Sequence, residues 1–178
     1  AALLDLGVDY DELVLELTGL GMEGYGVQAT RASRKGVFGT QVRVVTDPNQ
    51  PAHRDLRQIE AIIGASLLRE PVQSRAIAVF RRLAEAEAHI HDTSPDRIHF
   101  HEVGALDAIV DIVGGVIALD RLNVDRVLCS PVELGGGMAH CEHGVLPAPA
   151  PATLELLKGI PVKLGGAPFE TTTPTGAA

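Results

Sequence analysis

Residues 99–111 have the sequence HFHEVGALDAIVD, in which two histidines, one glutamate and two aspartates occupy five of thirteen positions. The first residues of this stretch alternate in polarity as a strand does. From Leu106 onward, apolar residues recur three and four positions apart, which predicts a helix ending near Asn123. The stretch is therefore predicted to join a buried extended segment to an amphipathic helix.

Strand-like and helical segments alternate in the rest of the second half. Residues 125–134 and 160–164 predict strands. Residues 151–159 begin with proline and end with glycine, which predicts a helix. The glycine-rich residues 135–144 predict a loop. Alternation of this kind favours a parallel or mixed sheet.

The first half of the chain carries different patterns. Asp9 and Glu12 resemble a capping box at the start of a short helix. Residues 25–46 alternate on either side of a turn, which predicts a β-hairpin, and apolar spacing predicts helices within 56–63 and 72–83. The predicted fold class is α/β, with a mixed sheet, a β-hairpin in the first half, and alternating strands and helices in the second.

The length and composition favour one globular domain over residues 1–178. A chain of 178 residues can bury one ordinary core, and 46% apolar with 21% charged residues is a globular composition that excludes disorder. The sequence starts at Ala1 without a methionine and stops without a terminal signal. We therefore expect it to be part of something longer.

Charge and cysteine content narrow the partners and the compartment. A net charge of -8 and only 3% aromatic residues, with no tryptophan, argue against nucleic acid as a partner. The longest apolar stretch, residues 109–119, is interrupted by Asp111 and is too short to span a membrane. Cys129 and Cys141 do not indicate a disulfide framework, so a cytoplasmic location is expected.

The side chains of residues 99–111 have the spacing of a metal site. His99 and His101 share one side of an extended segment, whereas Glu102 points to the other. Asp107 and Asp111 are four residues apart and share one face of the helix, directed near the histidines. Imidazole with carboxylate suits Zn, Ni, Co or Fe. The alternative is that Asp107 caps the helix or faces solvent, and that His99 and His101 bond to backbone groups.

Two further segments carry ligand-type residues. Residues 135–144 contain His140, Cys141 and His143 after three glycines, which permit positive φ or close approach to a ligand. A plain flexible loop is an equal alternative. Residues 170–178, ETTTPTGAA, offer hydroxyls and a glycine that could hold phosphate oxygens, although a solvated turn is the commoner use of such a sequence.

Three stretches together resemble a known family. HFHEVGALDAIVDIVGG, HGVLPAPAPATLELLKG and ETTTPTGAA, in this order, resemble the nickel-insertion proteins that mature the nickel-pincer nucleotide cofactor of lactate racemase (LarC-type proteins). The similarity covers nearly the whole chain. Members of that family are roughly twice as long, so the resemblance implies that this chain is the N-terminal portion.

The resemblance implies a nickel chelatase, an enzyme of the lyase class. Its reaction would insert Ni²⁺ into pyridinium-3,5-bisthiocarboxylic acid mononucleotide, with CTP as co-substrate accompanied by Mg²⁺ or Mn²⁺. The implied partner is this small-molecule precursor, without nucleic acid or membrane, and a homo-oligomer is compatible with the family. The fragment alone is expected to bind ligand without completing turnover.

The family's motif positions fall on particular residues of this chain. From these matches we infer metal ligands at His99, His101, Asp107, Asp111 and His143. We infer catalytic roles for Glu102 and Asp107. Cofactor binding is assigned to Thr172, Thr173, Thr175 and Gly176. The chain departs from the family in the loop before RDLRQIEAII, where a long histidine tract is reduced to His53, which makes nickel storage in that loop doubtful.

Two other functions are compatible with the same residues. One is a nickel-binding chaperone or storage module without chemistry of its own. The other is a metal-dependent hydrolase, in which Glu102 or an aspartate activates metal-bound water.

Overall fold

The computed structural model describes residues 1–49, 53–100, 104–141 and 144–178. The first half contains α1 (Ala2–Asp5), α2 (Tyr10–Thr18), β1 (Tyr25–Arg34), β2 (Val37–Thr46), β3 (Arg54–Asp55), α3 (Leu56–Gly64) and α4 (Glu70–Ile90). The second half contains the 3₁₀ helix η1 (Pro95–Arg97), β4 (His99–Phe100), α5 (Leu106–Arg121), β5 (Val132–Glu133), β6 (Met138–Cys141), β7 (Gly144–Pro147), α6 (Pro151–Leu156), β8 (Val162–Lys163) and α7 (Pro174–Ala177). Helices and paired strands alternate as the sequence predicts, so the α/β class is confirmed.

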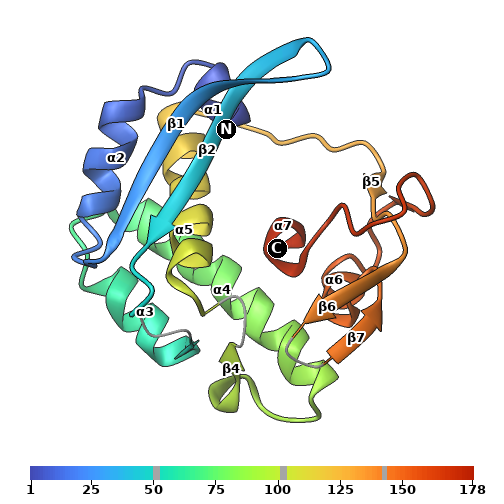
Figure 1. Cartoon of the computed structure of the whole chain (residues 1–178). Coiled ribbons are helices and arrows are strands. Elements are labelled where there is room, and N and C mark those ends of the chain that lie inside the picture. Colours follow the sequence, from blue (N-terminus) through green and yellow to red (C-terminus); the bar gives the residue numbers. More distant parts are fainter. Residues whose placement is uncertain (50–52, 101–103, 142–143) are drawn as a thin grey trace.

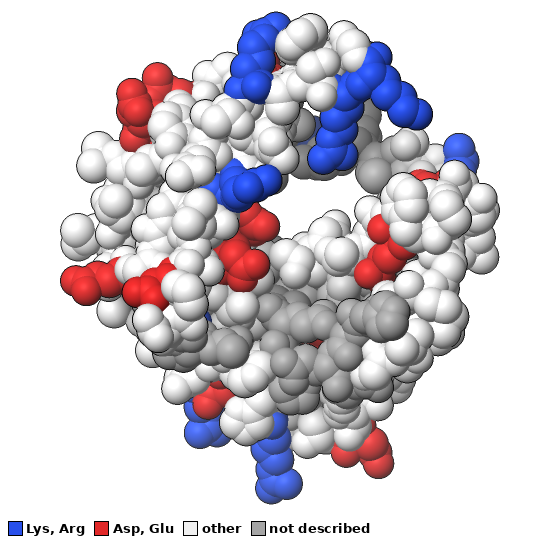
Figure 2. Space-filling view, in the orientation of Figure 1, with Lys and Arg blue, Asp and Glu red and all other residues white. Residues whose placement is uncertain are grey.

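The elements form two sides joined by the long helix α4. Figure 1 shows α2, α3, α5 and the β1/β2 hairpin on one side, with the short strands β5–β7 and helix α6 on the other. Helix α4 packs against α3 and α5 on the first side and against α6 on the second. The space-filling view shows an opening between the two sides (Figure 2).

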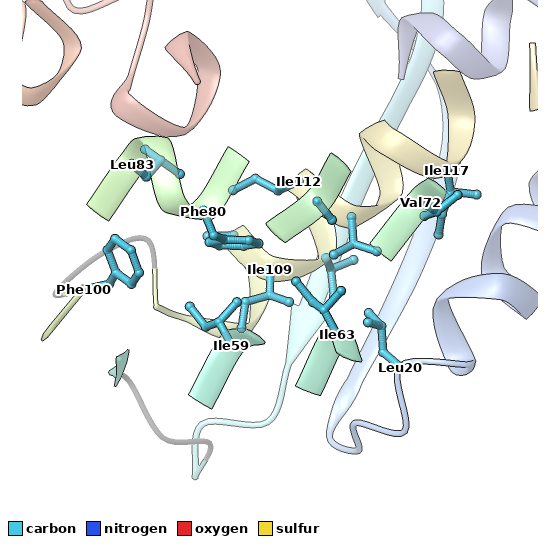
Figure 3. Close-up of a cluster of buried hydrophobic side chains, with 14 of the residues drawn as sticks. Leu20, Ile59, Ile63, Val72, Phe80, Leu83, Phe100, Ile109, Ile112 and Ile117 are labelled. Atoms are coloured by element: carbon cyan, nitrogen blue, oxygen red, sulfur yellow. The ribbon is translucent and has the colours of Figure 1, made fainter. Parts of the chain in front are cut away.

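Helix α5 lies at the centre of the hydrophobic core. Its Ile109, Val113 and Ile117 side chains are fully buried, at the spacing that the sequence predicts. They pack with fully buried side chains of α4, including Phe80, and of α3, including Ile59 (Figure 3). The helical period of 3.6 residues thus fixes which face of α5 is internal.

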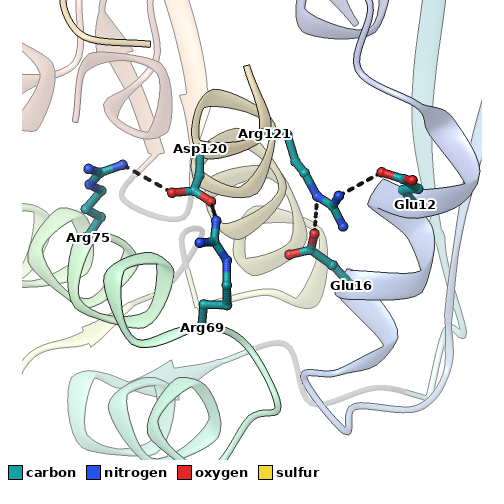
Figure 4. Close-up of polar contacts among 6 residues, drawn as sticks. All are labelled: Glu12, Glu16, Arg69, Arg75, Asp120 and Arg121. Atoms are coloured by element: carbon teal, nitrogen blue, oxygen red, sulfur yellow. Dashed lines mark hydrogen bonds and ion pairs between the residues drawn. The ribbon is translucent and has the colours of Figure 1, made fainter. Parts of the chain in front are cut away.

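Ion pairs at the surface join the same helices around this core (Figure 4). Arg69 and Arg75, at the start of α4 and within it, both pair with Asp120 near the end of α5. Arg121 pairs with Glu12 and Glu16 of α2, at 2.7 Å from Glu12. Exposed pairs of this kind contribute little stability individually, so the apolar contacts dominate the packing.

The predicted β-hairpin is confirmed over its full length. Strands β1 and β2 pair antiparallel from Tyr25 opposite Thr46 to Arg34 opposite Val37. The two turn residues Lys35 and Gly36 both have positive φ, 51° and 83°, which is the conformation of a type I′ hairpin turn.

The second half differs from the sequence prediction in two places. The strand predicted over 125–134 is confined to Val132–Glu133, which pairs in parallel with β8. In the described part of the chain, no strand pairs with residues 125–131, and an unpaired strand leaves its backbone groups unsatisfied. The predicted loop 135–144 instead contains β6, which pairs antiparallel with β7. Four residues are too few for alternation to be recognised in the sequence.

A helix that could cross a membrane would need to be both long and apolar. No helix within the described ranges meets both conditions.

We expect Phe80→Ala to destabilise the protein by about 3–5 kcal/mol, because Phe80 is fully buried. The centres of the Phe80 and Phe100 rings also lie 6.4 Å apart, in an edge-to-face arrangement. Urea denaturation would measure the loss. Phe38→Ala is the matched control, because Phe38 is 62% exposed and its removal should change stability by no more than about 0.5 kcal/mol. Similar losses for both variants would contradict this account of the core.

Candidate functional site

The structure brings the aspartates of α5 beside the C-terminal threonine segment. Asp107 and Asp111 line one side of an open hollow of about 470 Å³. Thr173, Thr175 and Gly176 line the other side. Two groups of residues that the sequence singles out separately, more than sixty positions apart, therefore surround the same space.

Asp111 is the residue of this hollow whose electrostatics are most perturbed. Although Asp111 reaches solvent, desolvation raises the pKa of its carboxyl above the ordinary 3.8, and the nearby Asp107 carboxylate raises this pKa further. Asp111 also lines a second, largely apolar hollow of about 120 Å³ between α5 and the β1/β2 hairpin. The surroundings of Asp111 therefore disfavour its ionised form on balance.

Asp107 is in a different local environment. It lies in the first turn of α5, where the unsatisfied backbone N–H groups and the helix dipole favour a negative charge. The Asp107 carboxylate is therefore favoured by its place at the start of the helix, whereas the Asp111 carboxylate is disfavoured by its surroundings. The two carboxylates also repel each other.

The threonine segment is held in place by Glu133. The hydroxyls of Thr171 and Thr172 donate to the backbone carbonyl of Glu133 at 2.5 and 2.8 Å. The Glu133 side chain accepts hydrogen bonds from the backbone N–H groups of Gly135 and Gly166, at 3.1 and 3.2 Å. The Thr172 hydroxyl thus bonds to β5 and is outside the lining of the hollow.

The remaining threonine contacts shape the end of the segment. The Thr173 hydroxyl accepts a hydrogen bond from Gly176 N–H at 3.3 Å, which caps the short helix α7. Glu170, three residues earlier, accepts from the N–H of Ala150 at 3.0 Å. These bonds present Thr175 and Gly176 to the hollow opposite the aspartates.

Two glycines of the run, Gly135 and Gly137, are needed for the local backbone conformation and for the close approach of another segment. Gly135 and Gly137 have φ of +71° and +83°, as the sequence led us to expect for at least part of the run. A Cβ on Gly135 would lie 2.0 Å from the carbonyl oxygen of Phe169, and a Cβ on Gly137 would lie 2.5 Å from that of Pro168. The backbone that approaches these glycines is therefore the chain's own segment leading into the threonines.

The other predicted ligands are not gathered at the hollow. His99 is exposed in β4, whose backbone pairs with Asp55 of β3. His101, Glu102 and His143 lie outside the described residues, so the predictions for them remain predictions. Within the described ranges, no group of three or more His, Cys, Asp or Glu residues is arranged to hold a metal ion, so His99 does not complete such a group with Asp107 and Asp111.

Several positioning residues were not identified from the sequence. Glu133 lies two residues before the glycine run, and Glu170 is the first residue of the segment 170–178, so their positions beside the glycines and the threonines were the available signal. Arg54 donates to the carbonyl of Gly104 at 3.1 Å. A Cβ on Gly104 would lie 2.6 Å from the Arg54 backbone nitrogen. Only glycine at 104 allows β3 and the start of α5 to approach so closely.

Comparison with known proteins gives consistent results. The profile of the family described as "Nickel insertion protein" matches residues 1–178. A putative nickel insertion protein of Wolinella succinogenes is 48% identical over 179 residues, covering 99% of this chain and 45% of the relative. A protein of Clostridium kluyveri, named pyridinium-3,5-bisthiocarboxylic acid mononucleotide nickel insertion protein, is 45% identical over 192 residues, covering 100% of this chain and 48% of the relative. The chain spans about half the length of the curated relatives it matches, and no solved structure matches it.

We expect Asp111→Asn to stabilise the protein at pH 7. The substitution removes a desolvated charge and a like-charge repulsion of about 0.2–0.5 kcal/mol. The pKa of Asp111 is higher in the folded state than in the unfolded chain. Protonation of Asp111 therefore contributes fully to the stability of the folded wild type below pH 3.8, and this contribution is lost as the pH rises through the raised pKa. The advantage of the variant should therefore grow from pH 3.8 to 7 in denaturation experiments.

Asp107→Asn is the paired control for this prediction. It removes the same repulsion but also the interaction of a carboxylate with the start of α5, which contributes about 0.3–1 kcal/mol. Asp107→Asn should therefore be less stable than Asp111→Asn at pH 7. Equal effects of the two substitutions would contradict the assigned environments.

A second prediction concerns the approach of the threonine segment to Gly135. Gly159→Ala should cost about 1–2 kcal/mol, because Gly159 has φ of +80° and open space around it, so only backbone strain is added. Gly135→Ala should cost more, because the Phe169 carbonyl must also move. Hydrogen exchange at the amide of Thr171, which donates to Leu134 at 3.3 Å, should accelerate in Gly135→Ala alone. Equal exchange rates of the Thr171 amide in Gly135→Ala and Gly159→Ala would contradict this prediction.

Proposed function

The chain belongs to the nickel insertion protein family, and on that basis we propose that it takes part in inserting Ni²⁺ into pyridinium-3,5-bisthiocarboxylic acid mononucleotide. The observation that carries this proposal is the hollow between α5 and α7. It combines two carboxylates with hydroxyl and glycine groups. Such a surface suits a metal ion on one side and the oxygens of a nucleotide on the other.

The donor chemistry of the hollow supports transfer of the metal. A protein that delivers nickel to thiocarboxylate sulfurs must hold it through ligands that release it, and oxygen and imidazole ligands do so more readily than a thiolate cage. Asp107 and Asp111 supply oxygens from the described part of the chain. We propose that His101 and His143 complete the ligand set, and that Glu102 acts with Asp107 in the transfer step.

The electrostatics of α5 support a cation at the same place. Two carboxylates four residues apart repel each other, and Asp111 is additionally desolvated. A divalent ion between them reverses both penalties. Metal binding therefore offsets a cost that the folded chain carries without a ligand.

The finer features of the reaction are proposed from the family resemblance. We infer a lyase-class chelatase that uses CTP with Mg²⁺ or Mn²⁺, ions that prefer oxygen ligands of the kind found in the hollow. Its product would serve lactate racemase. A cytoplasmic location, a homo-oligomer and a single domain over 1–178 that is the N-terminal portion of a longer protein are likewise proposed.

A second candidate is a nickel carrier without chemistry of its own. It is compatible with the oxygen donors of the hollow, because Asp107 and Asp111 can bind a metal ion without any reaction following. A carrier would bind nickel with an affinity that does not depend on nucleotide, whereas the chelatase would bind both and form product in combination with the remaining part of a relative.

Nickel titration of purified protein, with and without precursor and CTP, tests the proposal. Asp107→Asn/Asp111→Asn should weaken nickel binding by at least about tenfold. Asp11→Asn/Asp96→Asn changes the charge equally on surface elements away from the hollow and should leave the affinity unchanged. In the chain combined with the remaining part of a relative, replacing His99, His101 and Asp107 together with alanine should abolish insertion while leaving the protein soluble. Unchanged nickel incorporation in that triple variant would refute the site.

A further inference from the structure

The β1/β2 hairpin differs in charge from the rest of the chain. Residues 25–46 contain four basic residues, Arg31, Arg34, Lys35 and Arg43, and no Asp or Glu. The other 11 of the 15 basic residues, and all 23 acidic residues, lie elsewhere. The hairpin therefore has a charge of +4 within a chain whose net charge is -8.

The basic groups of the hairpin have no carboxylate within ion-pair distance among the described residues, although the Arg31 charge helps to lower the pKa of Asp5. In the described portion of the protein, none of these four residues takes part in an ion pair. The helix arginines behave differently, since Arg69, Arg75 and Arg121 all pair with acidic side chains (Figure 4). Arg31, Arg34 and Lys35 lie near the turn, whereas Arg43 lies opposite Gln28 farther along the strands. Three like charges close to one another favour an anionic ligand.

The distal end of the hairpin also presents an aromatic ring. The Arg31 guanidinium lies 5.5 Å from the centre of the Phe38 ring. Phe38 and its neighbour Val37 are 62% and 75% exposed, and both line a shallow hollow of about 470 Å³ together with Arg34. An exposed aromatic side chain beside guanidinium groups fits a flat ring that carries a phosphate.

The middle of the hairpin is fixed beside α1 and α5, and the hollow at its distal end shares Ala1 and Val42 with the apolar hollow that Asp111 lines. The Asp5 carboxylate of α1 accepts hydrogen bonds from the N–H and the hydroxyl of Thr40, at 3.1 and 2.6 Å. Val27 and Val44, on the inner face of the hairpin, line the apolar hollow that Asp111 also lines. Figure 2 shows basic side chains over the hairpin at one rim of the opening and acidic side chains on its flanks.

We propose that the distal end of the hairpin, with Arg31, Arg34, Lys35 and Phe38, binds the phosphate and the pyridinium ring of a mononucleotide. This inference rests on the proposed function, in which the aspartate hollow takes the metal. The phosphomonoester meets the guanidinium and ammonium groups, and the cationic ring meets the exposed Phe38. The phosphate of the substrate is thereby assigned to a basic surface, apart from the acidic hollow that is assigned to the free metal ion.

Calorimetric titration of the 178-residue protein with nicotinic acid mononucleotide, in low salt and without nickel, tests the proposal. Arg31→Gln/Arg34→Gln/Lys35→Gln should weaken binding at least tenfold. The matched control is Arg57→Gln/Arg81→Gln/Arg97→Gln, which changes net charge equally on α3, α4 and η1 and should stay within twofold of the wild type. Inorganic phosphate should compete, and the nucleoside without phosphate should bind at least tenfold more weakly.

Several outcomes would overturn this inference. They are absence of mononucleotide binding by the wild type, unchanged binding by the hairpin variant, or an equal loss in the control variant. Cosedimentation with anionic phospholipid vesicles, or a hairpin-dependent dimer in light scattering, without mononucleotide binding, would assign the surface to a membrane or to a second copy instead. Thermal unfolding of both triple variants excludes loss of fold as the cause.

Nickel titration of the same proteins separates this inference from the proposed function. The hairpin variant should retain nickel binding, whereas Asp107→Asn/Asp111→Asn should lose nickel binding and keep the mononucleotide. If the aspartate variant binds nickel as the wild type does, while the hairpin variant loses mononucleotide binding, the metal site alone is refuted. The reverse pattern would refute the phosphate site alone.

Discussion

Burial of one face of α5 against α4, α3 and the hairpin is the contact that organises this protein. Ile109, Val113 and Ile117 are fully buried on that face. Because each residue advances about 100° around a helix, Asp107 and Asp111 must lie on roughly the opposite side. The apolar core therefore determines where the carboxylates are, without any specific contact that positions them.

The other wall of the hollow is positioned by a different kind of force. The segment leading to Thr173 is exposed over much of its length and contributes little to the core. Its placement depends on hydrogen bonds to Glu133, on Glu170, and on the absence of side chains at Gly135 and Gly137. A site built in this way has one rigid wall, set by packing, and one wall set by backbone hydrogen bonds, which open at lower free energy than a core does.

Much of the fold could be predicted because its longer elements repeat a pattern many times. Helix α5 and the ten-residue strands of the hairpin each contain enough apolar positions to reveal their period. Strand β6 and helix α7, with four residues each, do not. Residues 125–131 have the composition of a strand, yet strand formation requires a neighbour, which local sequence cannot supply.

The candidate site shows the same division. The shared face of Asp107 and Asp111 follows from helical spacing, and the family assignment follows from three motifs in order. Their meeting with Thr175 and Gly176 is a tertiary contact that no periodicity encodes. The engagement of Thr172 with β5 is equally invisible in sequence, because a hydroxyl suits a phosphate and a carbonyl alike.

Asp111 borders two spaces at once, the polar hollow beside α7 and the small apolar hollow under the hairpin. Because Asp111 is in the lining of both hollows, any movement of its carboxylate toward α7 also changes the lining of the hollow under the hairpin. By thermodynamic linkage, whatever the metal does to the affinity of the hairpin for its ligand, that ligand does equally to the affinity for the metal. A ligand that moves this carboxylate in one space is therefore coupled to any ligand in the other.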